Sequence, residues 1–129
     1  MALSKSTLLI SLLLAGCAVK FDPVEHSRLV DIRHRVETAT HDHHCKQPEL
    51  ARATADQLHR DSRWLLIYSQ HIPNNSSLEK MSQELVKTTE EFAGRYRSAT
   101  PSVIYCDLKL KNIAQQIEII QRTNARRPR

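Results

Sequence analysis

The segment most suggestive of chemistry is the run His41-Asp42-His43-His44-Cys45. Imidazole nitrogens and thiolates are ligands that Zn²⁺ and copper ions prefer. If the run is helical, His41, His44 and Cys45 share one face and can converge on a single ion. If it is a loop, His41, His43 and His44 form either a weak metal site or a polar segment that faces solvent. Both interpretations stay open at this point.

No other part of the sequence has the spacing of a catalytic site. Glu90 and Glu91 are adjacent, and adjacent residues on a helix diverge by about 100°, so their carboxylates cannot converge on one substrate atom. The chain contains no G-x-S-x-G, H-E-x-x-H or C-x-x-C-H motif, and its two glycines are too few for a phosphate-binding loop. The sequence therefore predicts a protein that is not an enzyme and that carries no cofactor such as haem.

The positive charge of the chain is concentrated at its ends. The formal net charge of +5 comes from 19 Lys and Arg against 14 Asp and Glu. Lys5 lies near the start, and the last eight residues include Arg122, Arg126, Arg127 and Arg129. Without these five, the basic side chains fall to 14 and balance the acidic ones. A basic tail on a neutral body predicts no nucleic-acid partner.

Four amphipathic segments are expected to position these groups. Their predicted starts are Asp22-Pro23, Pro48, a capping box at Ser76-Ser77-Leu78-Glu79, and Thr100-Pro101. The last segment is the clearest, because spacings of 3, 4, 3, 4 and 3 separate Val103, Cys106, Leu110, Ile113, Ile117 and Ile120. Four such helices with short links predict an all-α fold, an up-and-down four-helix bundle.

The apolar patch Trp64-Leu65-Leu66-Ile67-Tyr68 is wider than one helical stripe. A short buried strand would explain it, but its place within a longer helical pattern favours a helix. Trp64 and Tyr68 are one turn apart, so they are either core residues or an exposed aromatic anchor for a partner.

The N-terminus has the pattern of an export signal. Lys5 precedes an apolar run from Leu8 to Leu14, which is shorter than the about 20 residues that a spanning helix needs. The residues Leu14-Ala15-Gly16-Cys17 then resemble the lipobox of bacterial lipoproteins. An ordinary signal peptide followed by an unmodified cysteine is the alternative.

The lipobox resemblance is confined to those four residues and implies lipidation of Cys17. In that family the thiol takes a diacylglycerol, palmitate-type acyl chains hold the protein on a membrane, and cleavage makes the cysteine the first residue. Ala18 follows, where an aspartate commonly retains lipoproteins in the inner membrane. The resemblance therefore implies an anchor in the periplasmic leaflet of a Gram-negative outer membrane, with the inner membrane as the alternative.

Assigning Cys17 to lipid leaves Cys45 and Cys106 as a pair in an oxidising compartment, which predicts a disulfide. In an up-and-down bundle, Cys45 follows the first helix and Cys106 lies about one turn into the fourth. Both positions fall at the same end of the bundle. The bond would occupy the thiol of Cys45, which is then lost as a metal ligand.

These expectations divide the chain into a signal peptide (1–16), a lipidated N-terminus and tether (17–22), a bundle (23–121) and a basic tail (122–129). The tail arginines Arg122, Arg126, Arg127 and Arg129 are expected either to meet anionic lipid headgroups at the membrane or to be solvated.

The predicted function is a non-enzymatic binding or structural module in the cell envelope, whose partner is another envelope protein or the cell wall. A phage-encoded outer-membrane spanin-type lysis lipoprotein and an exclusion lipoprotein are alternatives. A metal-binding protein that uses His41, His43 and His44 is a further one.

Overall fold

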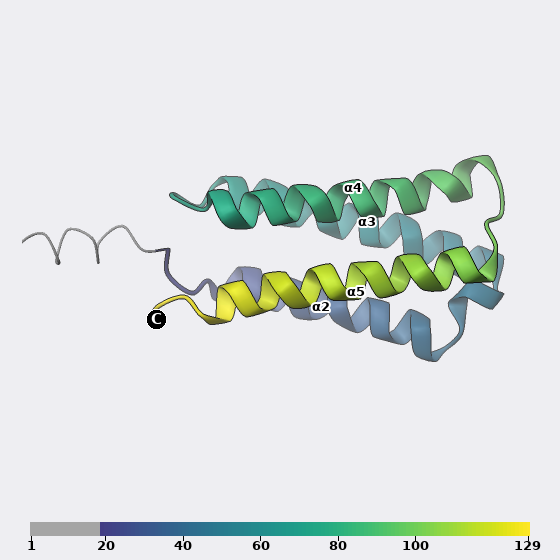
Figure 1. Cartoon of the computed structure of the whole chain (residues 1–129), viewed down its shortest axis with the longest axis horizontal. Helices are drawn as coiled ribbons and strands as arrows, with labels where there is room; N and C mark the ends of the chain where they lie inside the picture. The colour runs from purple at the N-terminus through teal and green to yellow at the C-terminus, as the bar shows by residue number, and fades with distance from the viewer. Residues whose placement is uncertain (1–18) are drawn as a thin grey trace, which may run out of the picture.

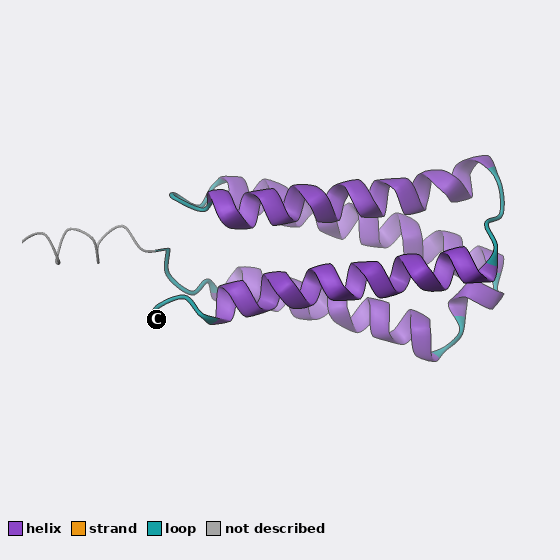
Figure 2. Ribbon diagram, in the orientation of Figure 1, coloured by secondary structure: helices purple, strands orange, loops and turns teal. Residues whose placement is uncertain are grey.

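A computed structural model describes residues 19–129, and the predicted signal peptide and the predicted lipidation site, Cys17, lie outside these residues. The helices are α2 (Pro23–His41), α3 (Pro48–Gln70), α4 (Ser76–Ser98) and α5 (Val103–Ala125), with a short 3₁₀ helix, η1 (His44–Lys46), between α2 and α3. Successive helices run antiparallel, and α5 also packs on α2 and closes the ring (Figures 1 and 2). The predicted up-and-down four-helix bundle is confirmed. None of the helices described combines the length and apolarity needed to cross a bilayer.

Local signals at the helix starts explain most of the boundaries. The Asp22 side chain accepts a hydrogen bond from the Glu25 N–H at 2.9 Å, and Pro23 occupies the first turn of α2. Ser102 caps α5 in the same way, through the N–H of Tyr105. Each cap satisfies an N–H group that the helix itself leaves without a partner.

The predicted capping box at Ser76–Glu79 is wrong. Helix α4 already includes Ser76, and Asn75 is its N-cap residue, with no capping bond from its side chain. The Asn75 amide instead donates to the carbonyl of Ser69 at 3.0 Å, at the end of α3. The Asn75 side chain therefore contacts the end of α3 instead of capping α4.

The core consists of one apolar stripe from each helix. The predicted stripe on α5 is buried except for Val103, which is exposed. The patch around Leu65 lies in helix α3, and no strand is found between residues 19 and 129. The largest fully buried apolar side chains are Leu29, Ile32, Leu58, Leu65, Leu78, Leu85, Phe92, Leu110, Ile113, Ile117 and Ile120.

Different segments of the chain meet at the two ends of the bundle (Figure 1). One end, the terminal end, comprises residues 19–22, the α3–α4 link at 71–75 and residues 126–129. There the N–H of Phe21 donates to the carbonyl of Pro128 at 2.8 Å. The other end, the disulfide end, comprises residues 42–47 and the α4–α5 link at 99–102.

Candidate functional site at the two ends of the bundle

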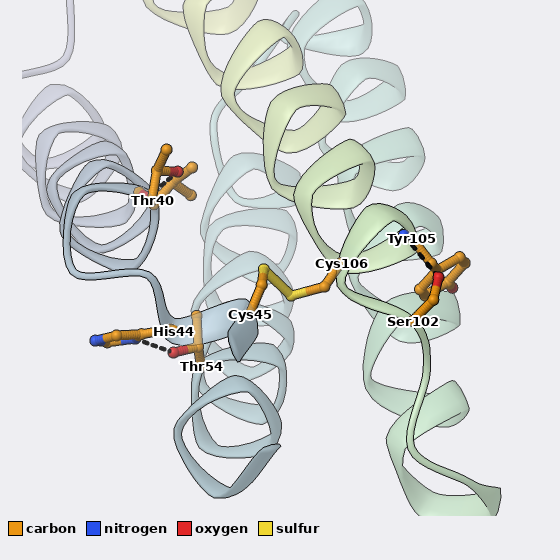
Figure 3. The surroundings of a disulfide bond; sticks show 8 residues. Thr40, His44, Cys45, Thr54, Ser102, Tyr105 and Cys106 are labelled. Atoms are coloured by element: carbon orange, nitrogen blue, oxygen red, sulfur yellow. Dashed lines mark hydrogen bonds between the residues drawn. A yellow bond between two sulfur atoms is a disulfide. The ribbon is translucent and has the colours of Figure 1, made fainter. Parts of the chain in front are cut away.

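A disulfide between Cys45 and Cys106 joins the α2–α3 link to the first turn of α5 (Figure 3). The two Cα atoms are 5.6 Å apart, and both residues are buried. The predicted disulfide is confirmed, and it lies at one end of the bundle as expected. Because it closes a loop of 61 residues, the chain-entropy model gives it about 4 kcal/mol of stabilisation.

The histidines beside this bond do not gather into one site. Helix α2 ends at His41, and His43 has a left-handed backbone with φ of 53°. The chain therefore never forms the continuous helix that would align His41, His44 and Cys45. Among residues 19–129, no group of three or more His, Cys, Asp or Glu side chains could hold a metal ion.

Each histidine has its own surroundings. His41 and His43 line a groove of about 740 Å³ between α2 and α5, whereas His44 lines a different groove between α2 and α3. The Nδ1 atom of His44 lies 2.9 Å from the Thr54 hydroxyl (Figure 3). The hydrogen bond from His41 holds the pKa of Asp42 below its usual value. The geometry thus gives the metal-binding alternative no support.

At the terminal end, a carboxylate and a guanidinium meet inside the bundle. Glu25, in the first turn of α2, is 0 % exposed, and Arg127 Nη1 lies 3.6 Å from its Oε2. Burial raises the pKa of the Glu25 carboxyl to about 7, and the charge of Arg127 opposes this rise. Arg127, whose side chain is 9 % exposed, also donates to the side-chain oxygens of Asn75 and Asn124.

Further hydrogen bonds tie this pair to the start of the chain. The Asn124 amide donates to the carbonyl of Asp22 at 3.3 Å, and its oxygen accepts from the N–H of Asp22. The Tyr68 hydroxyl donates to the Asp22 carboxylate at 3.0 Å. We call Asp22, Glu25, Tyr68, Asn75, Asn124 and Arg127 the terminal polar cluster. It fastens both chain ends to α3 and to the α3–α4 link.

The basic tail is shorter than predicted, because α5 continues to Ala125 instead of ending at 121. Buried Asn124 gives this last turn a tertiary partner. Of the four arginines expected either to meet headgroups or to be solvated, Arg127 does neither within the bundle, because its side chain is packed in the terminal polar cluster. Arg122, Arg126 and Arg129 remain exposed, and the Arg129 guanidinium lies 5.0 Å from the centre of the Phe21 ring.

One clue to this cluster is visible in the sequence. Glu25 precedes Leu29, Ile32 and Val36 by helical spacing, so a carboxylate falls on the buried stripe of α2. A buried carboxylate requires a hydrogen-bonding or cationic partner. Glu25 is not among the predicted site residues. Its partner Arg127 could not be predicted from local sequence, because the two residues lie near opposite ends of the sequence.

Near the terminal end, α2 and α3 present apolar side chains to solvent. Val24 is 50 %, Trp64 37 % and Ile67 53 % exposed, and we call these three residues the terminal apolar patch. The Trp64 ring stacks on Tyr68 at 5.1 Å, and the Arg28 guanidinium lies 4.1 Å from the centre of the Trp64 ring. Of the two interpretations of Trp64, the structure favours the exposed aromatic residue.

Comparisons of the chain with protein-family models, curated proteins and solved structures find no match. Its function therefore has to be inferred from the residues themselves.

Proposed function

We propose that this chain is an exported lipoprotein whose bundle acts as a non-enzymatic binding or structural module in the cell envelope. Its anchor is a lipid on Cys17 in the periplasmic leaflet of an outer membrane, and its partner is an envelope protein or the cell wall. The four-residue lipobox and the apolar run before it carry the assignment of the anchor.

The main structural support is the fastening of the N-terminal segment to the bundle. Phe21 is held by its hydrogen bond to Pro128, and Asp22 by Tyr68 and Asn124. Four residues of chain lead from Cys17 to Phe21, and they span at most about 14 Å when fully extended. An acylated Cys17 would therefore hold the terminal end close to the bilayer, with the disulfide end directed away from it.

The disulfide supports an extracytoplasmic location. Such bonds persist in oxidising compartments such as the bacterial periplasm and are rare in reducing ones. The Cys45–Cys106 bond is built into the bundle, with both cysteines buried. It favours an exported bundle over a cytosolic one.

Intact mass spectrometry of the full chain expressed in a Gram-negative host tests the anchor. The expected product begins at Cys17 and carries a diacylglycerol and a further acyl chain, since two or more chains are needed for stable anchoring. Cys17→Ser is the matched control and should remain unprocessed and unlipidated. A wild-type chain that keeps residues 1–16, or that begins at an unmodified Cys17, would contradict the proposal.

Crosslinking in intact envelopes tests the binding role. The wild-type protein should capture a specific protein or cell-wall fragment more strongly than the same lipidated N-terminus fused to an unrelated bundle. Equal capture by the two anchored proteins would argue against a binding module.

A further inference from the structure

We infer that the terminal apolar patch, Val24, Trp64 and Ile67, is a docking surface for the anionic phospholipid layer of the membrane that holds the protein. This inference rests on the proposed lipid anchor. It adds a second, side-chain contact with the membrane and fixes which face of the bundle the membrane covers.

The patch lies within reach of the anchor. Val24 is the second residue of α2, three residues after Phe21, which is itself at most about 14 Å from Cys17 along an extended chain. Ile67 and Trp64 precede the end of α3 at Gln70 by three and six residues, so both lie within about 9 Å of that end along the helix axis. A lipid on Cys17 thus brings all three side chains to headgroup level.

The chemistry of the patch suits the interface between headgroups and acyl chains. Tryptophan and tyrosine are enriched at this depth because their rings are apolar and also carry a polar group. Trp64 stacks on Tyr68, whose hydroxyl is turned to Asp22, and Arg28 lies against the Trp64 ring. Beside them is a shallow groove of about 310 Å³, lined by Pro23, Val24, Ser27, Arg28, Asp31 and Trp64.

The charges around the patch complement anionic lipid. Lys20, Arg126 and Arg129 are exposed at the terminal end, and Arg63, the neighbour of Trp64 in α3, is exposed as well. Glu25 is buried, and Asp22 accepts hydrogen bonds from Tyr68 and the α2 backbone. Asp31, beside Arg28 in the groove, is an exposed carboxylate within this surface. Juxtamembrane basic side chains are attracted to the negative surface potential of such leaflets.

One other exposed apolar residue, Ile104, provides a contrast. Ile104 is 73 % exposed but is the second residue of α5, at the disulfide end. It lies about 30 Å along the helix from the terminal end of α5. A membrane that covers the terminal apolar patch therefore leaves Ile104 in water, which makes Ile104 a matched control.

Trp64 is the only tryptophan in the chain, so its fluorescence reports this contact directly. The full-length lipidated protein is reconstituted into vesicles of phosphatidylethanolamine and phosphatidylglycerol, with or without bromine atoms on the acyl chains. We expect brominated lipid to reduce Trp64 fluorescence. We also expect less quenching when phosphatidylcholine replaces phosphatidylglycerol, because the cations then lose their counter-charge.

Vesicle flotation separates this inference from the anchor. Protein that floats and is quenched supports docking. Protein that floats without quenching overturns docking but leaves the lipoprotein proposal standing, whereas protein that fails to float overturns both. A photo-crosslinker at position 67 that captures another protein rather than lipid in intact cells would also overturn docking.

Variants localise the contact. Ile67→Ser and Val24→Ser should reduce quenching of Trp64, whereas Ile104→Ser should leave it unchanged. All three positions are exposed, so we expect the helical circular dichroism spectrum to stay the same. Equal quenching in all four proteins would show that Val24 and Ile67 do not take part in the contact, and would overturn docking through this patch.

Discussion

The two ends of the bundle are closed by different chemistry. At the disulfide end, one covalent bond between buried cysteines joins η1 to α5, and the neighbouring histidines are distributed over separate grooves. At the terminal end, hydrogen bonds and a buried ion pair join four segments that include both chain ends.

This difference makes each end sensitive to a different condition. The disulfide responds to reductant and is indifferent to moderate changes in pH. The terminal polar cluster responds to pH because it buries a carboxylate whose pKa is near neutrality. One bundle thus has a redox-dependent end and a proton-dependent end, and each can be weakened separately.

The largest effect is expected from removing the disulfide. The double variant Cys45→Ala, Cys106→Ala should lose about 4 kcal/mol of unfolding free energy, because the unfolded chain regains the freedom of the long loop. Urea unfolding followed by circular dichroism measures this loss. Reductant should bring the wild-type protein to the level of the double variant and leave the variant itself unchanged. Equal urea midpoints in all these samples would contradict the expectation.

Removing the cation at the terminal end should have the next largest effect. Arg127→Met leaves Glu25 as an uncompensated buried charge, which costs about 3 kcal/mol at pH 8. At pH 5 the loss should be smaller, since Glu25 is then protonated in the folded protein. The exposed neighbour Arg126→Met is the control and should change the urea midpoint little at either pH. If the variant loses the same unfolding free energy at both pH values, Arg127 does not stabilise the fold by compensating the charge of Glu25.

The pH dependence of the wild-type protein has a definite sign. The folded pKa of Glu25 is about 7, above its ordinary value of 4.5, so between these values the folded state holds a proton that the unfolded state has released. Stability should therefore fall as the pH rises from 4.5 to 7, by at most about 3 kcal/mol. Glu25→Gln should remove this fall. If the variant keeps the wild-type slope, another group is responsible.

The smallest expected effect compares one helix cap from each end. Ser102→Ala removes the cap of α5 and should cost about 1 kcal/mol. Asp22→Ala removes the cap of α2 and also the acceptor of the Tyr68 hydroxyl, so its cost should be larger, about 2 kcal/mol. Thermal unfolding of the two variants side by side provides the measurement. An Asp22→Ala loss no larger than that of Ser102→Ala would show that the contact with Tyr68 adds nothing.

The sequence predicted the features that depend on local or periodic signals. The stripe on α5 was visible because its apolar residues repeat at helical spacing, and the start of α2 because Asp22 and Pro23 are adjacent. The disulfide followed once export was assumed and two cysteines remained. The helix order then placed both cysteines at one end.

The features that the sequence did not predict depend on contacts between distant segments. Asn75, instead of Ser76, is the N-cap residue of α4, and its side chain makes hydrogen bonds with Ser69 and Arg127 instead of capping the helix. The sequence placed Arg127 in the basic tail, whereas in the structure Arg127 pairs with Glu25, which lies near the other end of the sequence. Within the run at 64–68, composition alone could not tell that Leu65 is buried while Ile67 is exposed.

The hydrogen bond from Phe21 to Pro128 has a practical consequence for anyone who labels this protein. A reporter fused after Arg129 would emerge beside the N-terminal segment and would crowd the packed Arg127. The α4–α5 link at 99–102, at the opposite pole, is a better insertion point, because a fluorescent or affinity module placed there would leave both chain ends in their native positions.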